Sequence, residues 1–334
     1  MFENKNGLNA PLNTTLSIIS KDFKKLNKIQ GKDAKMFDIE WLIPNFLLKG
    51  TLVMVYARAG SGKSWWAYCL ANHILNAENS IDEVFYLDAD NGLVTLKNRG
   101  VDRLLENERI NYKLLNGAEH CDIFKSLKTY DFSKKLIIID SIRDFMSHVN
   151  FNSDKEVTAY LQDLKVLRDN GATIVFLHHQ QKQTDGENNK QYKGSTAFID
   201  SVDEAYWLDN IGENNKFLLY FEPQKCRDET KPKVFVLDTA NFDFKILEDK
   251  EVKMLGLIDI ERITLELACE VINSHEKINQ GNLAKKIKAL ANDRAFDIVG
   301  NNSLWRLLKK FDRILFKISK GGYNRKELIF TSLS

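Results

Sequence analysis

Residues 57–64 read Ala-Arg-Ala-Gly-Ser-Gly-Lys-Ser and stand between an apolar run, Thr51–Tyr56, and a helical pattern, Lys63–Leu75. Glycines at these positions let successive backbone N–H groups face a phosphate beside the positive end of the following helix. The stretch therefore predicts a P-loop, and the alternative is a glycine-rich turn that binds nothing. The residues expected to bind a nucleotide are Ala59, Gly60, Ser61, Gly62, Lys63, Ser64 and Trp65. Lys63 is expected to reach the β- and γ-phosphates of ATP, and Ser64 to ligate Mg²⁺.

On both sides of this loop, apolar runs short enough to be buried strands alternate with helical patterns. Strands that alternate with helices favour a mainly parallel sheet in an α/β fold. The expected strands are 51–56, 84–87, 136–139, 173–177, 204–208 and 216–221, with a closing hairpin at 234–237 and 242–246. The expected helices are 63–75, 94–107 and 155–168.

Polar residues end three of these strands, where a parallel sheet gathers its functional groups. Asp140 ends the run Leu-Ile-Ile-Ile-Asp, a Walker B pattern that predicts a second Mg²⁺ ligand beside Ser64. Asp88 and Asp90 follow Val84–Leu87 and are expected on the same side; we favour Asp90 as the base and keep Asp88 as the alternative. His178 and His179 directly follow the expected strand 173–177 and are expected near the phosphates.

Composition excludes several classes of protein. Of the 334 residues, 43% are hydrophobic and 28% are charged, as in a folded globular chain. No apolar run reaches the ~18 residues of a membrane span, and the N-terminus lacks a secretory pattern. The four cysteines are far apart, which disfavours a disulfide framework or a zinc site. We therefore expect a cytoplasmic protein with no membrane partner.

The basic excess is confined to the C-terminal part. Residues 256–334 contain 14 Lys and Arg against 9 Asp and Glu, whereas the rest contains 34 against 37. Three helix-sized segments (259–275, 280–290 and 302–311) precede two strand-like runs around a Gly-Gly-Tyr-Asn turn, a pattern typical of a winged helix. Arg306, Lys309 and Lys310 are candidate DNA contacts, and docking of a protein is the alternative. The predicted division is a polar arm (1–35), an ATPase domain (36–250) and this basic domain (256–334).

These motifs together resemble the RecA-like ATPase core, and from about Phe37 to Leu247 the RepA-type hexameric replicative helicases of plasmids and phages. Three further segments carry the resemblance. They are Trp41–Leu47 leading into Gly50–Val53, Leu177–Lys182, and Lys193–Ala197 followed by Asp200.

The resemblance implies roles for particular residues. Asp90 takes the position of the catalytic glutamate, although it is one methylene shorter, and His179 takes that of the γ-phosphate sensor. Lys225 and Arg227 resemble an arginine-finger segment that enters the ATP site of a neighbouring subunit. Residues 148–154 and 180–193 would line a central channel, where Lys182, Lys190 and Lys193 would contact DNA. A solvated strand end and a plain surface loop are the respective alternatives.

The sequence thus predicts an ATP- and Mg²⁺-dependent DNA helicase acting in replication of a plasmid, phage or integrated element. Its expected partners are single-stranded or forked DNA, further copies in a hexameric ring, and a replication initiator or loader. Two rivals are a RecA-like ATPase that does not unwind DNA and an ATP-switched initiator or regulator that binds DNA through its winged helix.

Overall fold

The computed structural model describes residues 39–115, 120, 122–181, 190–212, 216–227, 230–321 and 327–333. The predicted N-terminal arm lies outside the described residues. Among the described helices, none is both long and apolar enough to cross a bilayer.

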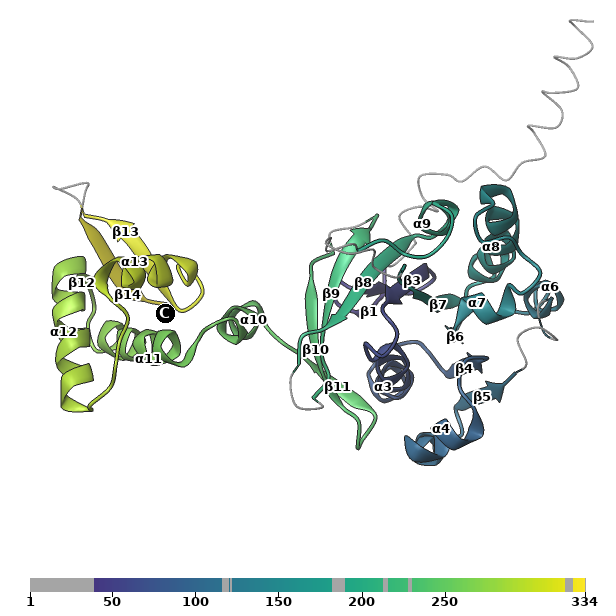
Figure 1. Ribbon diagram of the computed structural model, residues 1–334, viewed down its shortest axis with the longest axis horizontal. Helices are drawn as coiled ribbons and strands as arrows, with labels where there is room; N and C mark the ends of the chain where they lie inside the picture. Colours follow the sequence, from purple (N-terminus) through teal and green to yellow (C-terminus); the bar gives the residue numbers. More distant parts are fainter. Residues whose placement is uncertain are drawn as a thin grey trace, which may run out of the picture. The chain divides into compact units, whose positions relative to one another are not determined.

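A nine-stranded sheet in the order β11-β10-β9-β8-β3-β7-β6-β4-β5 forms the centre of the larger part of the chain (Figure 1). Strands β8 to β5 in this order run parallel, and β9, β10 and β11 form an antiparallel extension. The strands are β3 (Leu52–Ala57), β4 (Glu83–Asp88), β5 (Ile110–Leu114), β6 (Lys135–Asp140), β7 (Thr173–His179), β8 (Glu204–Asn210), β9 (Leu218–Lys225), β10 (Lys233–Asp238) and β11 (Asp243–Ile246). A separate pair, β1 (Trp41–Ile43) and β2 (Leu47–Leu48), precedes them.

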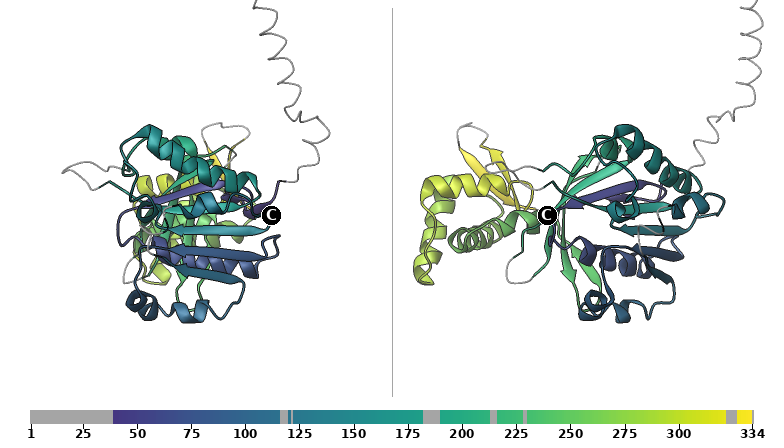
Figure 2. Two further views of the ribbon diagram at one scale, coloured as in Figure 1. Left: turned by 90° about the vertical axis from the view of Figure 1, so that its right-hand side faces the viewer. Right: turned by 45° about the vertical axis from the view of Figure 1, so that its right-hand side comes forward.

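Helices cover both faces of the sheet, which explains why the central strands are apolar throughout. In β3, Val53 and Val55 belong to one core cluster, and Leu52 and Met54 to the other. The first core includes α3 (Lys63–Asn76) and α5 (Val101–Leu104), and the second includes α6 (Ile123–Ser126), α7 (Ile142–Phe145), α8 (Asp154–Asp169) and α9 (Ala197–Ser201). Figure 2 shows these helix layers from two other directions.

The order of the strands sets the position of the site. Strand β7 pairs with β3 on one side and with β6 on the other, so it separates the strand of the P-loop from the strand that ends in Asp140. All three run parallel, and their carboxyl ends meet at one edge of the sheet. A mainly parallel sheet with this arrangement is the predicted RecA-like α/β fold.

Two predictions for this part of the chain need correction. The helix expected at 94–107 is two short helices, α4 (Leu93–Asn98) and α5, because Gly100 has a left-handed backbone (φ 67°) and interrupts the helix. The edge strand β5 was not predicted. Its sequence, Ile-Asn-Tyr-Lys-Leu, is half exposed and lacks the continuous apolar character of the buried strands.

The C-terminal residues enclose a hydrophobic core of their own, which includes Leu265, Ile287, Leu308 and Phe330. After a short helix, α10 (Asp249–Leu255), the order is α11 (Asp259–Asn273), β12 (Ile278–Asn279), α12 (Gln280–Asp293), α13 (Asn301–Lys310), β13 (Phe316–Lys320) and β14 (Leu328–Ser332). The strands form an antiparallel sheet in the order β12-β14-β13. The predicted turn at 321–324 lies outside the described residues except for Gly321.

Candidate functional site

The P-loop joins β3 to α3 at the carboxyl edge of the sheet. Gly60 and Gly62 have φ values of 78° and 91°, which only glycine adopts without strain. The ammonium of Lys63 donates to the carbonyl oxygens of Arg58 and Ala57, at 3.0 and 3.3 Å. Burial lowers the pKa of Lys63, and the nearby carboxylates of Asp140 and Asp90 oppose this shift. The loop therefore holds its one buried cation where a phosphate would bind.

Asp140 lies next to the P-loop and is 1% exposed. Its carboxylate accepts hydrogen bonds from the hydroxyl groups of Ser64 and of Tyr86, the latter at 3.0 Å. Burial, and then the negative charge of Asp88, raise the pKa of Asp140 to about 7. A divalent cation would offset both effects, and a hydroxyl beside a carboxylate is an oxygen donor pair suited to Mg²⁺. The predicted ligands Ser64 and Asp140 are thus brought together.

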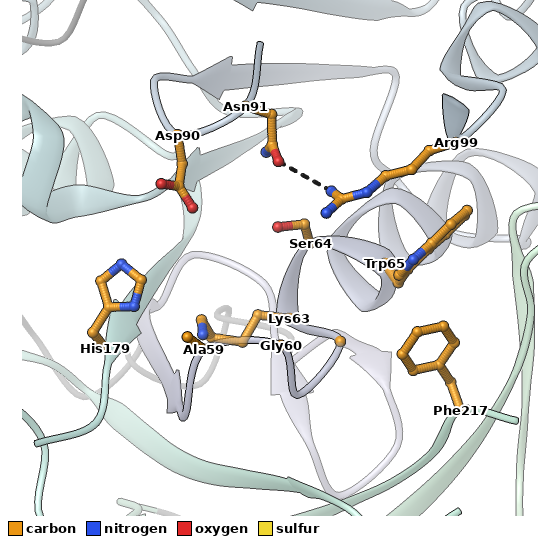
Figure 3. Close-up of a pocket in the computed structure, with 11 residues that line it drawn as sticks. Ala59, Gly60, Lys63, Ser64, Trp65, Asp90, Asn91, Arg99, His179 and Phe217 are labelled. Atoms are coloured by element: carbon orange, nitrogen blue, oxygen red, sulfur yellow. Dashed lines mark hydrogen bonds between the residues drawn. The ribbon is translucent and has the colours of Figure 1, made fainter. Parts of the chain in front are cut away.

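Asp88 and Asp90 do not lie side by side as predicted. Strand β4 ends at Asp88, so the alternation of side chains does not continue to Asp90. Asp88 is fully buried: it accepts hydrogen bonds from the backbone N–H groups of Asp90 and Asn91, both at 3.0 Å, and from the hydroxyl of Tyr112. Burial raises the pKa of Asp88, although these hydrogen bonds oppose the shift. Asp88 therefore shapes the turn, and Asp90 faces the pocket (Figure 3).

The two histidines at the end of β7, His178 and His179, have different surroundings. His178 is buried, stacks on Phe198 with ring centroids 4.4 Å apart, and donates from Nε2 to the carbonyl oxygen of Lys193 at 2.7 Å. Burial lowers its pKa to about 4. His179 lines the pocket, and burial and then the charge of Lys63 lower its pKa. Only His179 is placed to contact a phosphate.

The P-loop, Asp90 and His179 line one pocket, which also has an aromatic end (Figure 3). The sequence predicted some residues of this pocket but not the complete set. Asp90 and His179 lie at one end, Lys63 and Ser64 in the middle, and Trp65 and Phe217 at the other end. The rings of Trp65 and Phe217 are 6.0 Å apart and tilted by 41°. Such rings offer flat apolar surfaces for a nucleobase.

Two polar residues near the aromatic end were also missed. The guanidinium of Arg99 lies 5.8 Å from the ring centroid of Trp65 and donates to Oδ1 of Asn91 at 3.1 Å. Asn91 lies in the turn after β4 and Arg99 directly follows α4, and no motif marks either of them as a pocket residue. Phe217 precedes β9, 153 residues after Ser64 in the chain, and only the antiparallel extension of the sheet brings it to the P-loop.

We expect Phe217→Ala to raise the Kd of ATP about tenfold, because stacking of a base on an aromatic ring contributes about 1–3 kcal/mol. Inorganic tripolyphosphate, which has no base, should bind both forms equally in a calorimetric titration, and Phe217→Tyr should bind ATP normally. The ring also packs on the loop, since a Cβ at Gly62 would lie 2.8 Å from its Cδ1 atom. Equal losses for both ligands would mean that Phe217 supports only the P-loop.

The predicted finger residues lie away from the P-loop: Lys225 pairs with Ala205, level with Met54 in the middle of β3, and Arg227 lies near the start of β3. Lys225 donates to the carbonyl oxygens of Ile199 and Asp200, at 2.8 and 2.9 Å. Arg227 is 66% exposed and pairs with Asp203 at 3.2 Å, whose carboxylate accepts from the N–H of Leu52 at the start of β3. At about 3.3 Å per residue, the length of β3 places Arg227 about 20 Å from the P-loop of its own chain. Arg227 therefore cannot serve that site, and Lys225 is held by two carbonyl oxygens outside it.

The predicted DNA contacts are in different settings. Lys182 lies outside the described residues. Lys190 is engaged within the chain, since it pairs with Glu222 at 2.6 Å and lies 4.5 Å from the ring centroid of Trp207. Lys193 is exposed, and its N–H donates to the carbonyl oxygen of His179 at 2.9 Å. Arg306, Lys309 and Lys310 are exposed on α13.

The fold and the site define a P-loop ATPase domain of the RecA-like class. A family model described as an AAA domain matches residues 25–185. Among solved structures, the chain is similar to the flagellar accessory protein FlaH from Methanocaldococcus jannaschii, with 14% identity and a TM-score of 0.43 over 60% of this chain and 90% of that one. No curated protein matches the chain.

Proposed function

We propose that the protein is a DNA-dependent ATPase that assembles into a ring and unwinds DNA during replication of a plasmid, phage or integrated element. One observation carries this proposal: His179 lines the nucleotide pocket, and its carbonyl oxygen accepts a hydrogen bond from the backbone N–H of Lys193. Lys193 is the last residue of the predicted DNA-contacting segment, 180–193. A change at the phosphates can therefore be transmitted to this loop through one strand end. The resemblance to the RepA-type helicases agrees with this coupling.

The residues of the pocket divide the work of hydrolysis. Lys63 and the N–H groups of the P-loop hold the phosphates of ATP, and Ser64 and Asp140 hold Mg²⁺, which neutralises phosphate charge when bound. Asp90 orients the attacking water and accepts its proton. His179 donates a hydrogen bond to the γ-phosphate, and burial beside Lys63 keeps its ring neutral.

Assembly of several subunits would complete the site. Arg227 lies near the start of β3, at the end of the strand opposite the P-loop, so its role in hydrolysis requires the ATP site of a neighbouring copy, and Lys225 would enter that site with it. A cation supplied by a neighbour stabilises charge in the transition state only within an oligomer. Because the chain resembles the RepA-type hexameric helicases, we propose that six copies form a ring. DNA would pass through its central channel, along residues 148–154 and 180–193 of each copy.

For residues 256–334 we propose a winged-helix domain that contacts DNA, separate from the ATPase domain at 36–250. The order helix, strand, two helices and two strands, with β14 between β12 and β13, supports this proposal. The exposed face of α13 has Arg306, Lys309 and Lys310 and no acidic residue. The same face favours a second candidate function, an initiator or regulator that binds duplex DNA and uses ATP as a switch.

Strand separation on a labelled fork tests the proposal. We expect the protein with ATP and Mg²⁺ to unwind the fork, and Lys63→Ala not to do so. If ATP is hydrolysed and the fork stays paired, with a replication loader supplied, the helicase proposal is wrong. Tight, sequence-dependent binding of duplex DNA in that case would favour the regulator.

A further inference from the structure

The side chain of Asn91 connects three charged groups, and it has no role in the hydrolysis described above. Its Nδ2 atom donates to Oδ2 and Oδ1 of Asp88, at 3.1 and 3.2 Å, and to Oδ2 of Asp140 at 3.4 Å. Its Oδ1 atom accepts a hydrogen bond from Arg99 at 3.1 Å (Figure 3). One amide therefore joins two buried carboxylates to a cation in the wall of the nucleotide pocket.

The neighbours of Asn91 fix the direction in which its amide points. An ionised carboxylate only accepts hydrogen bonds, and a guanidinium only donates them. If the amide were reversed, its oxygen would face the carboxylates of Asp88 and Asp140, and its N–H groups would face Arg99. All of these contacts would then be repulsive. Asp88 is itself held in place by the backbone N–H groups of Asp90 and Asn91, so the amide is attached to a fixed point.

Arg99 depends on this contact for its position. It directly follows α4, in which no side chain is buried. Its guanidinium lies 5.8 and 5.9 Å from the ring centroids of Trp65 and Tyr68, and its hydrogen bond to the hydroxyl of Tyr68 is long, at 3.5 Å. Within the described part of the chain, no carboxylate forms an ion pair with it. Because a long side chain has much rotamer freedom to lose, the bond to Asn91 is what fixes the guanidinium over Trp65.

We propose that Asn91 is a positioning residue that holds Arg99 over Trp65 and so shapes the end of the pocket that receives the nucleoside of ATP. The proposal rests on the proposed function in that this pocket binds ATP. Because the P-loop holds the phosphates, the sugar and base lie toward Trp65, on the side of the pocket where Arg99 is (Figure 3). A side chain that is already fixed before binding loses less entropy in the complex. Asn91 therefore strengthens binding of the nucleoside through Arg99.

Calorimetric titration with ADP and with pyrophosphate, each in the presence of Mg²⁺, tests this role. Pyrophosphate makes the contacts of the phosphates and lacks the nucleoside. We expect Asn91→Ala to raise the Kd of ADP about tenfold, the effect of losing one hydrogen bond to a charged group, and to change the Kd of pyrophosphate by less than about twofold. Asn91→Gln keeps both the donor and the acceptor, so it should bind ADP more tightly than Asn91→Ala.

A double-substitution cycle shows whether Asn91 acts through Arg99. Arg99→Gln alone should weaken ADP about tenfold and spare pyrophosphate. Adding Asn91→Ala to it should weaken ADP by no more than about a further twofold, because residues that act through one contact have non-additive effects. Arg99→Gln leaves the bonds between Asn91 and the carboxylates in place, so its selectivity for ADP tests the proposal even if Asn91→Ala folds poorly. Asn98→Ala, at an exposed position of α4, is the matched control and should bind both ligands normally.

Three results would overturn the proposal. Equal losses for ADP and pyrophosphate would show that Asn91 acts at the phosphate end, through Asp140. Additive losses in the double variant would show that Asn91 and Arg99 act independently, and normal ADP binding in Asn91→Ala would show no role. The helicase proposal fails separately: a protein that shows the expected losses and never unwinds a fork keeps the role of Asn91, and normal ADP binding by Asn91→Ala in an unwinding protein removes it.

Discussion

Lys63→Ala should lower ATP hydrolysis at least about 100-fold, measured as phosphate release under saturating Mg²⁺ and ATP. Lys63 is the buried cation of the P-loop, and its ammonium at present donates to the carbonyl oxygens of Arg58 and Ala57. We expect this ammonium, in the nucleotide complex, to help neutralise developing charge on the phosphates. Removing one such donor from a closed site costs about 10²–10³ in rate.

A matched substitution controls for folding in this experiment. Lys97→Ala removes an exposed lysine from α4 and should leave hydrolysis unchanged. Thermal unfolding of Lys63→Ala should remain cooperative, because the side chain makes only two hydrogen bonds to its own loop. Hydrolysis at the wild-type rate in a folded Lys63→Ala protein would remove the nucleotide site from this pocket.

Much of the fold was predictable because its central strands are buried on both faces. The runs that became β3, β4, β6 and β7 are nearly all apolar, and each was placed to within two residues. The half-exposed strand β5 shows where this signal ends, since Ile110 alone is buried in it. The break at Gly100 was missed because a helical pattern continues on both sides of it.

The site was predictable where residues adjacent in sequence act together. Residues 59–64 form the P-loop through local backbone geometry, and Asp140 ends a recognisable strand. At the aromatic end, Trp65 was predicted as a nucleotide-binding residue, but Phe217 was not predictable, because it reaches the P-loop only through the order of the sheet. Tyr86 and Tyr112 likewise orient Asp140 and Asp88 from within strands, where they resemble ordinary core residues.

The second large effect is expected when the general base is removed, and we assign this base to Asp90 and not to Asp88. Asp90→Asn should lower the rate of hydrolysis at least about 100-fold and leave the Kd of ATP nearly unchanged, because a general base contributes about 10²–10⁴ to the rate without holding the substrate. Asp90→Glu should restore a measurable rate, since the added methylene extends the carboxylate toward the phosphates. Single-turnover hydrolysis, with nucleotide binding measured in parallel, separates the two effects.

Asp88→Asn tests the alternative in the same assay. Its carboxylate is buried and accepts from the N–H groups of Asp90 and Asn91, so the amide should loosen the turn and lower the unfolding temperature. We expect a smaller loss of rate than for Asp90→Asn, because Asp90 keeps its carboxylate although its position is less fixed. Normal turnover in Asp90→Asn together with an inactive but stably folded Asp88→Asn would reverse the assignment. The base would then be a buried carboxylate whose pKa burial raises, and the pocket residue would have only a structural role.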